Sequence, residues 1–223
     1  MKQIITIFIA LMSAFIISCG QKISDTSENS SANTANHSSH SMSNMHNNNN
    51  KGSEIIDLMH APMMEQPFEK TQNIDADFLV NMIPHHQGAI LSSKKLLETT
   101  TNDALITLAN NIIAEQEKEV AEFTALVTEL KNKNTSYADI DTQALGNEME
   151  TIMNNMMKDM SSIEVTGDND IDFLKGMIPH HQAAVDVSKK ILEFTKDDKI
   201  KEIANNIIAS QEKEISDMNN MLK

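Results

Sequence analysis

From residue 74 onward, apolar side chains recur with the 3.6-residue period of an amphipathic helix. One stripe consists of Phe78, Met82, His86, Ile90 and Leu97, and a second runs from Leu105 to Val127. Between them the polar segment 98–103 supplies capping residues for the second helix. No stretch of the chain shows the alternation and β-branched enrichment of a strand. The pattern therefore predicts an all-α protein.

The helical pattern occurs twice. Residues 75–123 align without a gap on residues 170–218 at a constant offset of 95, with 28 identities in 49 positions. Convergent helical patterning would match polarity classes rather than residue identities, so this is a duplication. Each copy is interpreted as a helical hairpin. Two hairpins related by a pseudo-twofold axis can bury their four apolar stripes in a four-helix bundle.

A methionine-rich segment precedes each hairpin, and we expect the two segments to form extra short helices. They are Ile55–Met64 and Glu148–Met160. The second segment places Met149, Met153, Met156 and Met160 on one helical stripe. The predicted organisation is a first repeat over 55–130, an irregular connector over 131–147 and a second repeat over 148–223.

The N-terminus resembles the signal peptide of a bacterial lipoprotein. Lys2 is followed by an apolar run over residues 4–17, which ends at Ser18-Cys19-Gly20. A transmembrane anchor is the alternative, but the run falls short of the ~20 residues that a spanning helix needs. We expect cleavage after residue 18, lipid attachment at Cys19, and a membrane-anchored protein that faces the periplasm or the cell surface.

Residues 19–54 are expected to be a flexible tether, because they are rich in Ser and Asn and contain little that could form a core. The tether also contains potential ligands between His37 and His46. These are explained equally well by composition drift in a linker. If they bind copper, they should bind it weakly, because the segment must become ordered on binding.

Composition restricts the possible partners and ligands. The formal net charge is −14, and every basic residue is Lys, which disfavours nucleic acid and attracts cations. The single cysteine is used for the lipid, so no disulfide or thiolate metal site is expected. Soft metal ligands would have to come from the 16 methionines, which occur beside one Tyr and no Trp. Thioethers with imidazoles suit Cu(I) first and Cu(II) next.

Both copies contain Met-Ile-Pro-His-His-Gln, which places a thioether one helical turn before two imidazoles. The candidate ligands are Met82, His85, His86, Met177, His180 and His181. A pair of core or capping histidines beside a core methionine would be the structural explanation. The recurrence of the pair favours metal binding, and His60 is the only other histidine after residue 52. Pro84 and Pro179 predict either a kink beside the histidines or a helix that starts later.

The methionine-rich segments would provide additional ligands in each copy. These candidates are Met59, His60, Met63, Met64, Met153, Met156, Met157 and Met160. Gln116 and Gln211 lie on apolar stripes. Each either orients a metal-binding imidazole or reaches solvent at the edge of its stripe. Because the repeats are equivalent, we expect each copy to bind copper separately.

The repeated pattern Asp-x-Asp-Phe-Leu, Met-Ile-Pro-His-His-Gln and Gln-x-x-Glu resembles the bacterial domain-of-unknown-function family 305. The similarity covers roughly residues 55–223. It implies a ferritin-like helical fold, because the family has that fold. It also implies copper binding by Met and His, because the family includes periplasmic copper-binding CopM-type proteins.

Three functions compete. The favoured one is copper capture, storage or delivery without turnover, which involves a delivery partner that the sequence does not identify. A ferritin-like metalloenzyme is less favoured, because a di-iron site uses Glu-x-x-His motifs and this chain contains none. A metal-free interaction module with methionine-rich surfaces is the remaining alternative, but it leaves the duplicated histidine pairs unexplained.

Overall fold

The computed structural model describes residues 53–133 and 135–223, which fall within one compact unit. The helices are α1 (Glu54–Glu65), α2 (Ile74–Leu97), α3 (Asp103–Asn132), α4 (Thr142–Ser161), α5 (Asn169–Leu192) and α6 (Asp198–Met221). The described residues contain no strand, so the predicted all-α fold is confirmed. The predicted signal peptide, Cys19 and nearly all of the tether lie outside the described residues.

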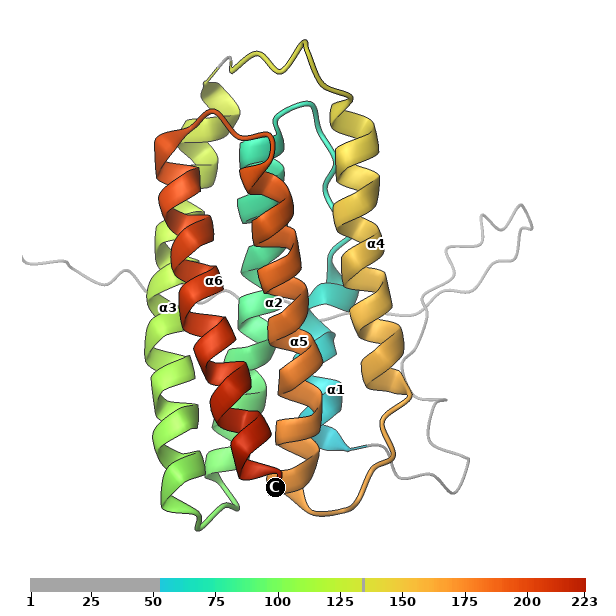
Figure 1. Ribbon diagram of the computed structural model, residues 1–223, viewed down its shortest axis with the longest axis vertical. Helices are drawn as coiled ribbons and strands as arrows, with labels where there is room; N and C mark the ends of the chain where they lie inside the picture. Colours follow the sequence, from blue (N-terminus) through green and yellow to red (C-terminus); the bar gives the residue numbers. More distant parts are fainter. Residues whose placement is uncertain (1–52, 134) are drawn as a thin grey trace, which may run out of the picture. The chain divides into compact units, whose positions relative to one another are not determined.

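The two hairpins, α2–α3 and α5–α6, form the expected ferritin-like four-helix bundle (Figure 1). The methionine-rich helices α1 and α4 both pack on α2 and α5. α1 has 12 residues, whereas α4 has 20 and is therefore longer than the short helix that was expected. None of the helices within the described ranges is apolar and long enough to span a membrane.

The connection between the repeats is shorter than the predicted 131–147. α3 continues to Asn132, and α4 already begins at Thr142. The early start follows from a cap, because the Asp141 side chain accepts a hydrogen bond from the backbone N–H of Ala144 at 2.9 Å. Gly146, expected in the connector, is consequently a buried residue inside α4.

The contacts between hairpins are reciprocal, as a pseudo-twofold axis requires. Thr195, after the end of α5, donates to Asp75 at the start of α2 over 2.6 Å. At the other end of these helices, Thr100, after α2, donates to Asp170 at the start of α5 over 3.1 Å. α2 and α5 are therefore antiparallel neighbours.

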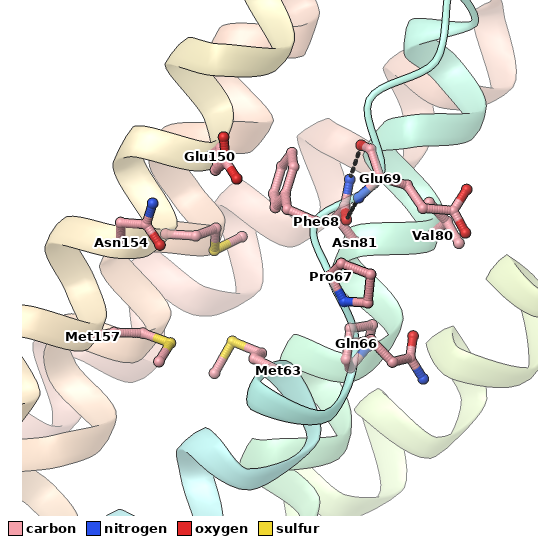
Figure 2. Close-up of a pocket in the computed structure, with 12 residues that line it drawn as sticks. Met63, Gln66, Pro67, Phe68, Glu69, Val80, Asn81, Glu150, Asn154 and Met157 are labelled. Atoms are coloured by element: carbon pink, nitrogen blue, oxygen red, sulfur yellow. Dashed lines mark hydrogen bonds between the residues drawn. The ribbon is translucent and has the colours of Figure 1, made fainter. Parts of the chain in front are cut away.

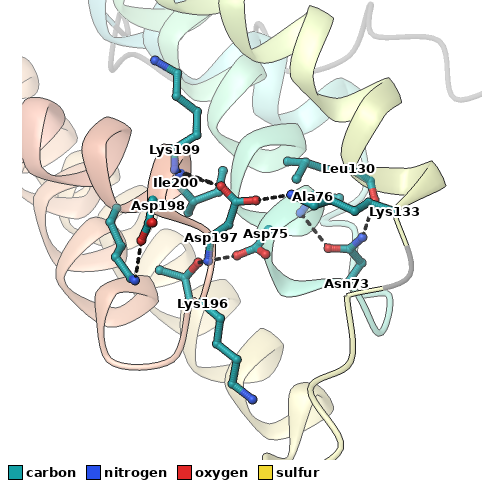
Figure 3. Close-up of polar contacts among 12 residues, drawn as sticks. Asn73, Asp75, Ala76, Leu130, Lys133, Lys196, Asp197, Asp198, Lys199 and Ile200 are labelled. Atoms are coloured by element: carbon teal, nitrogen blue, oxygen red, sulfur yellow. Dashed lines mark hydrogen bonds and ion pairs between the residues drawn. The ribbon is translucent and has the colours of Figure 1, made fainter.

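One end of the bundle has additional polar contacts (Figure 3). Asn73 caps α2 and also donates to the carbonyl of Leu130 near the end of α3. Lys133 forms an ion pair with Asp197, the N-cap of α6, at 2.7 Å. These contacts fasten the end of α3 to the starts of α2 and α6.

Asp75 lies at this end and is fully buried. Besides the Thr195 hydroxyl, its carboxylate accepts a hydrogen bond from the hydroxyl of Tyr137 in the connection between the repeats. Burial, followed by this hydrogen bond, raises the pKa of Tyr137 to about 12. The connection is thus attached to the start of α2 by a neutral phenol.

The packing of α1 on α2 depends on Gly88. A Cβ at this position would lie 2.1 Å from the carbonyl oxygen of Met59 in α1. The equivalent position in the second repeat is Ala183, so only the first hairpin carries the smaller residue here. The missing side chain allows the backbones of α1 and α2 to approach closely.

Candidate metal centre

Five buried histidines gather in the bundle, and we call His60, His85, His86, His180 and His181 the histidine layer. His60 is 8% exposed and the other four are fully buried. The ring centroids of His85 and His180 are only 3.7 Å apart, with the rings tilted by 30°. The two pairs therefore form one cluster, because antiparallel α2 and α5 bring equivalent positions together near their pseudo-twofold axis. The expectation of a separate site in each repeat is wrong in this respect.

Hydrogen bonds fix the tautomers of three of these imidazoles. His86 Nε2 donates to Glu119 at 2.9 Å, and His181 Nε2 donates to Glu214 at 2.8 Å. His85 Nε2 donates to the carbonyl oxygen of His180 at 3.1 Å. A neutral imidazole has one donor and one acceptor nitrogen. In the neutral form of each of the three rings, the Nδ1 atom therefore carries a lone pair.

These Nδ1 atoms are buried and have no hydrogen-bond partner in the part of the chain that the structure describes. The same is true of both ring nitrogens of His180. Leaving a buried polar group unpaired costs about 1–3 kcal/mol. The histidine layer therefore contains buried ring nitrogens that have no hydrogen-bond partner among the described residues.

Burial favours the neutral form of three of the five imidazoles. Burial lowers the pKa of His85 well below its ordinary value, and the neighbouring His86 and His181 lower it further. Burial and then His85 and the other histidines lower the pKa of His180 in the same way. Burial also lowers the pKa of His60, although Asp57 opposes it. A neutral imidazole is the form that binds a metal.

Thioethers lie in the same helices. Met82 and Met177 are fully buried one turn before the histidine pairs, as predicted. Met59 of α1 is also fully buried, and its sulfur would lie 3.1 Å from a Cβ placed on Gly176. Gly176 directly precedes Met177, so Met59 reaches α5 close to that methionine.

Pro84 and Pro179 lie inside continuous helices, ten residues after the first residue of α2 and of α5. The alternative of a helix that starts at the proline is therefore wrong. Because proline has no N–H, Pro84 cannot donate the usual helical hydrogen bond to the carbonyl of Val80.

The prediction for Gln116 and Gln211 needs correction. Both are only 2% exposed, so neither reaches solvent, and neither donates to or accepts from an imidazole among the described residues. Glu119 and Glu214, one turn later on the same helices, bond the histidines instead. A charged carboxylate makes a stronger hydrogen bond than a neutral amide does. The Gln-x-x-Glu pattern in both copies was the signal for these two residues, which the sequence interpretation did not select.

The methionines of the outer helices have different environments. Met156 and Met160 are buried at 3% and 1% exposure, whereas Met64 is 66% exposed. Met63, Met153 and Met157 line a cavity of about 220 Å³, which we call the methionine cavity. Figure 2 shows Met63 of α1 and Met157 of α4 extending toward one another across it.

Acidic residues lie on the α3–α6 side of the histidine layer. Burial, followed by the nearby Glu214 and Glu119, raises the pKa of Glu115. Glu115 and Glu214 line a groove of about 440 Å³ between α3 and α6. Within the described ranges, no three His, Asp or Glu side chains are grouped as a metal site. Additional metal ligands beside the imidazoles would therefore have to be the methionine thioethers.

Comparison with known proteins places this chain in a family. The family described as Domain of unknown function (DUF305) matches residues 8–127 and 75–222. The chain belongs to this family, and the two matches share residues 75–127, which cover most of the α2–α3 hairpin. The expected family membership is therefore confirmed.

Two individual proteins are similar to this chain. An uncharacterized protein of Acanthamoeba polyphaga mimivirus, L153, is 50% identical over 54 residues, which are 24% of this chain and 36% of the viral protein. The alignment therefore spans about a third of that relative. The solved structure titled "CopM in the Ag-bound form (by soaking)" is 27% identical and covers 66% of this chain and 93% of its own, with a TM-score of 0.49.

Proposed function

We propose that this chain binds copper through imidazole and thioether ligands and captures, stores or delivers the metal without turnover. The observation that carries the proposal is the histidine layer. In this layer, His85, His86 and His181 each donate a hydrogen bond from Nε2. The buried Nδ1 atom of each ring has no hydrogen-bond partner among the described residues. Copper bound there would provide the missing partner for these nitrogens.

The ligand chemistry favours copper over harder ions. The donors in and beside the layer are neutral imidazoles and the neutral thioethers of Met59, Met82 and Met177. Imidazole and thioether together suit Cu(I) and Cu(II), whereas Mg²⁺ and Ca²⁺ prefer oxygen ligands. Thioethers also need no deprotonation before binding.

Glu119 and Glu214 would act as positioning residues. A metal-binding imidazole commonly donates its other N–H to a carboxylate, which fixes its tautomer and raises its basicity. His86 and His181 have this arrangement in both copies, with nitrogen–oxygen distances of 2.9 and 2.8 Å. The proposal therefore assigns Nδ1 as the ligand atom of both residues.

A metal-free interaction module is less well supported. That function would use the methionine stripe of α4 as a surface for a partner. The four residues of the stripe are Met149, Met153, Met156 and Met160, and all are buried at 7% exposure or less. The stripe consequently packs against other residues of this chain and does not form a surface for a partner.

The location is part of the proposal. Residues 1–18 would direct export, Cys19 would carry the lipid, and residues 19–54 would tether the bundle to a membrane on its periplasmic or outer side. Incorporation of radiolabelled palmitate into the intact chain, and its loss in Cys19→Ser, would test this. Equal labelling of both forms would contradict the lipid anchor.

The copper proposal is tested by metal content. The intact chain would be loaded with copper under reducing and under oxidising conditions, and the bound metal would be measured by mass spectrometry. Because the two pairs form one cluster, replacing His85 and His86 with Ala should remove more than half of the histidine-dependent copper. Replacing His180 and His181 as well should remove the rest.

Helicity, followed by circular dichroism, is the control for folding. A fourfold histidine variant that keeps its helicity and its full copper content would show that the histidines are structural. The proposal would then fail.

A further inference from the structure

The methionine cavity lies outside the histidine layer but adjoins it. It is bounded by α1, the segment that follows α1, α2 and α4. Its wall includes Pro84, whose next residue in the chain is His85. Its three sulfurs come from different helices, since Met63 belongs to α1 and Met153 and Met157 belong to α4.

These methionines pack on the hydrophobic core and also line the cavity. Met63 and Met157 are half-buried, and their side chains extend toward one another across the cavity (Figure 2). Met153 is 7% exposed and lines the same cavity. Methionine is unbranched and has three rotatable bonds, so its sulfur can move toward a bound ion at little steric cost.

The charges at the rim of the cavity are balanced. Glu69 and Glu150 line it, while the described lining residues include no Lys, His or Cys. The nearest lysines are already paired: Lys70 contacts Glu150 at 2.6 Å, and Lys131 contacts Glu69 at 2.9 Å. Each of the two rim carboxylates is therefore neutralised by a lysine, so the thioethers would have to provide the binding.

We propose that the methionine cavity is a second metal site that binds a soft monovalent cation, Cu(I), through the thioethers of Met63, Met153 and Met157. The choice of copper rests on the proposed function, whereas the site itself is separate from the histidine layer. Thioethers without imidazole favour Cu(I) over Cu(II). The cavity should thus bind copper only in its reduced state.

The test replaces sulfur while keeping apolar volume. The intact chain with Met63→Leu, Met153→Leu and Met157→Leu retains side chains of similar size, because Leu and Met are close in volume. Bound copper is measured after loading with Cu(I) under a reductant and, separately, with Cu(II). The variant should lose one equivalent of Cu(I) and keep its Cu(II) content.

Two controls locate the effect. Met64→Leu changes a neighbouring methionine of α1 that is 66% exposed, so it should leave Cu(I) content unchanged. The fourfold histidine variant should lose Cu(II) but keep the one Cu(I) equivalent of the cavity. A loss of Cu(I) in Met64→Leu equal to that in the triple variant would overturn the assignment to the cavity.

The outcomes separate the two proposals. Full Cu(I) content in the triple variant would refute the cavity site, and the proposed function would stand if the histidine variants still lose copper. Absence of copper from the wild-type chain in both states would refute both proposals. A cavity that binds an apolar partner would lose no copper when its methionines become leucines.

A single substitution covers the case in which the triple variant does not fold. Even changes to groups behind the ligands cost about 10–100-fold in metal affinity. Met157→Leu, at a half-buried position, should therefore weaken Cu(I) binding about tenfold or more in competition with a Cu(I)-binding dye. Unchanged affinity in this folded variant would overturn the proposal.

Discussion

The two hairpins match one another down to single hydrogen bonds, whereas the helices that cover them differ. His86–Glu119 and His181–Glu214 have nitrogen–oxygen distances of 2.9 and 2.8 Å. In contrast, α1 has 12 residues and contains His60, while α4 has 20 residues and no histidine. Duplication has thus kept the two histidine–glutamate pairs equivalent, and the covering helices have diverged.

The difference separates two kinds of candidate metal chemistry. The symmetric part places imidazoles from both repeats at one axis. The divergent part places three thioethers around one cavity beside Pro84, whereas the groove beside Pro179 is lined by a single methionine, Met156. Variants at equivalent positions of the two repeats therefore test where the symmetry holds and where it fails.

The largest difference between the repeats should come from Asp75 and its equivalent Asp170. Asp75→Ala leaves the hydroxyls of Thr195 and Tyr137 without their acceptor, at about 1–3 kcal/mol each, and should lower the free energy of unfolding by about 2–4 kcal/mol. Asp170 is half-buried and accepts only from the Thr100 side chain. Asp170→Ala should cost about 1 kcal/mol or less. Urea denaturation of both variants measures this difference in the free energy of unfolding. Equal losses of stability would contradict the predicted asymmetry.

Acid should destabilise the symmetric histidine layer. The pKa values of His85 and His180 are lowered in the folded protein, so below pH 6.5 the unfolded chain takes up protons more readily. Their contribution to stability is present above pH 6.5 and is lost as the pH falls toward the folded-state values. The loss should reach about 1.4 kcal/mol per pH unit for each group.

The measurement for this acid effect is the free energy of unfolding of the metal-free protein at pH 7.5 and at pH 5.5. The double variant His85→Gln and His180→Gln lacks both titrating groups and should lose less stability over the same interval. If its loss equals that of the wild type, other groups cause the acid sensitivity.

The carboxylates behind the histidines should matter equally in both repeats. Glu119→Gln and Glu214→Gln should each weaken copper binding about 10–100-fold, which corresponds to about 1.4–2.7 kcal/mol. Glu117→Gln changes an exposed glutamate two residues away and should have little effect. Competition titrations compare the three variants. A loss confined to one of the two histidine–glutamate pairs would show that the layer is functionally asymmetric.

The smallest of these effects concerns the contact between α1 and α2. Gly88→Ala would place a Cβ 2.1 Å from the Met59 carbonyl oxygen, so α1 must move. Overpacking costs about 1–3 kcal/mol, and improved helix propensity returns about 1 kcal/mol of it. We expect a net loss of about 0–2 kcal/mol in urea denaturation. The reverse change, Ala183→Gly, should cost only about 0.5–1 kcal/mol, and a stabilising Gly88→Ala would contradict the close packing.

The sequence was sufficient for the fold and for part of the candidate site. The gapless repeat and the 3.6-residue period predicted the hairpins, and the paired Met-Ile-Pro-His-His-Gln motifs predicted a thioether and two imidazoles on one side of a helix in each copy. Helical spacing describes neighbours along one helix, however, and does not give the register between helices. The close approach of His85 to His180 could therefore not be predicted from the sequence.

Other features needed three-dimensional contacts. The stripe left open whether Gln116 is buried or reaches solvent, and the structure buries it. The hydrogen-bond partner of a histidine depends on competition between nearby groups, and Glu119 is the stronger acceptor. The methionines of α1 and α4 look alike in sequence. Only their environments separate Met64 in solvent from Met63 at the cavity and Met160 in the core.

The reciprocal contacts Thr195–Asp75 and Thr100–Asp170 are one contact made twice within a single chain. In a shorter ancestor with one hairpin, the same residues would have met across a symmetric, self-complementary interface between two identical subunits. Fusion of such subunits would make their association independent of concentration. It would also release each half from identity with the other, so that α1 and α4 could change separately.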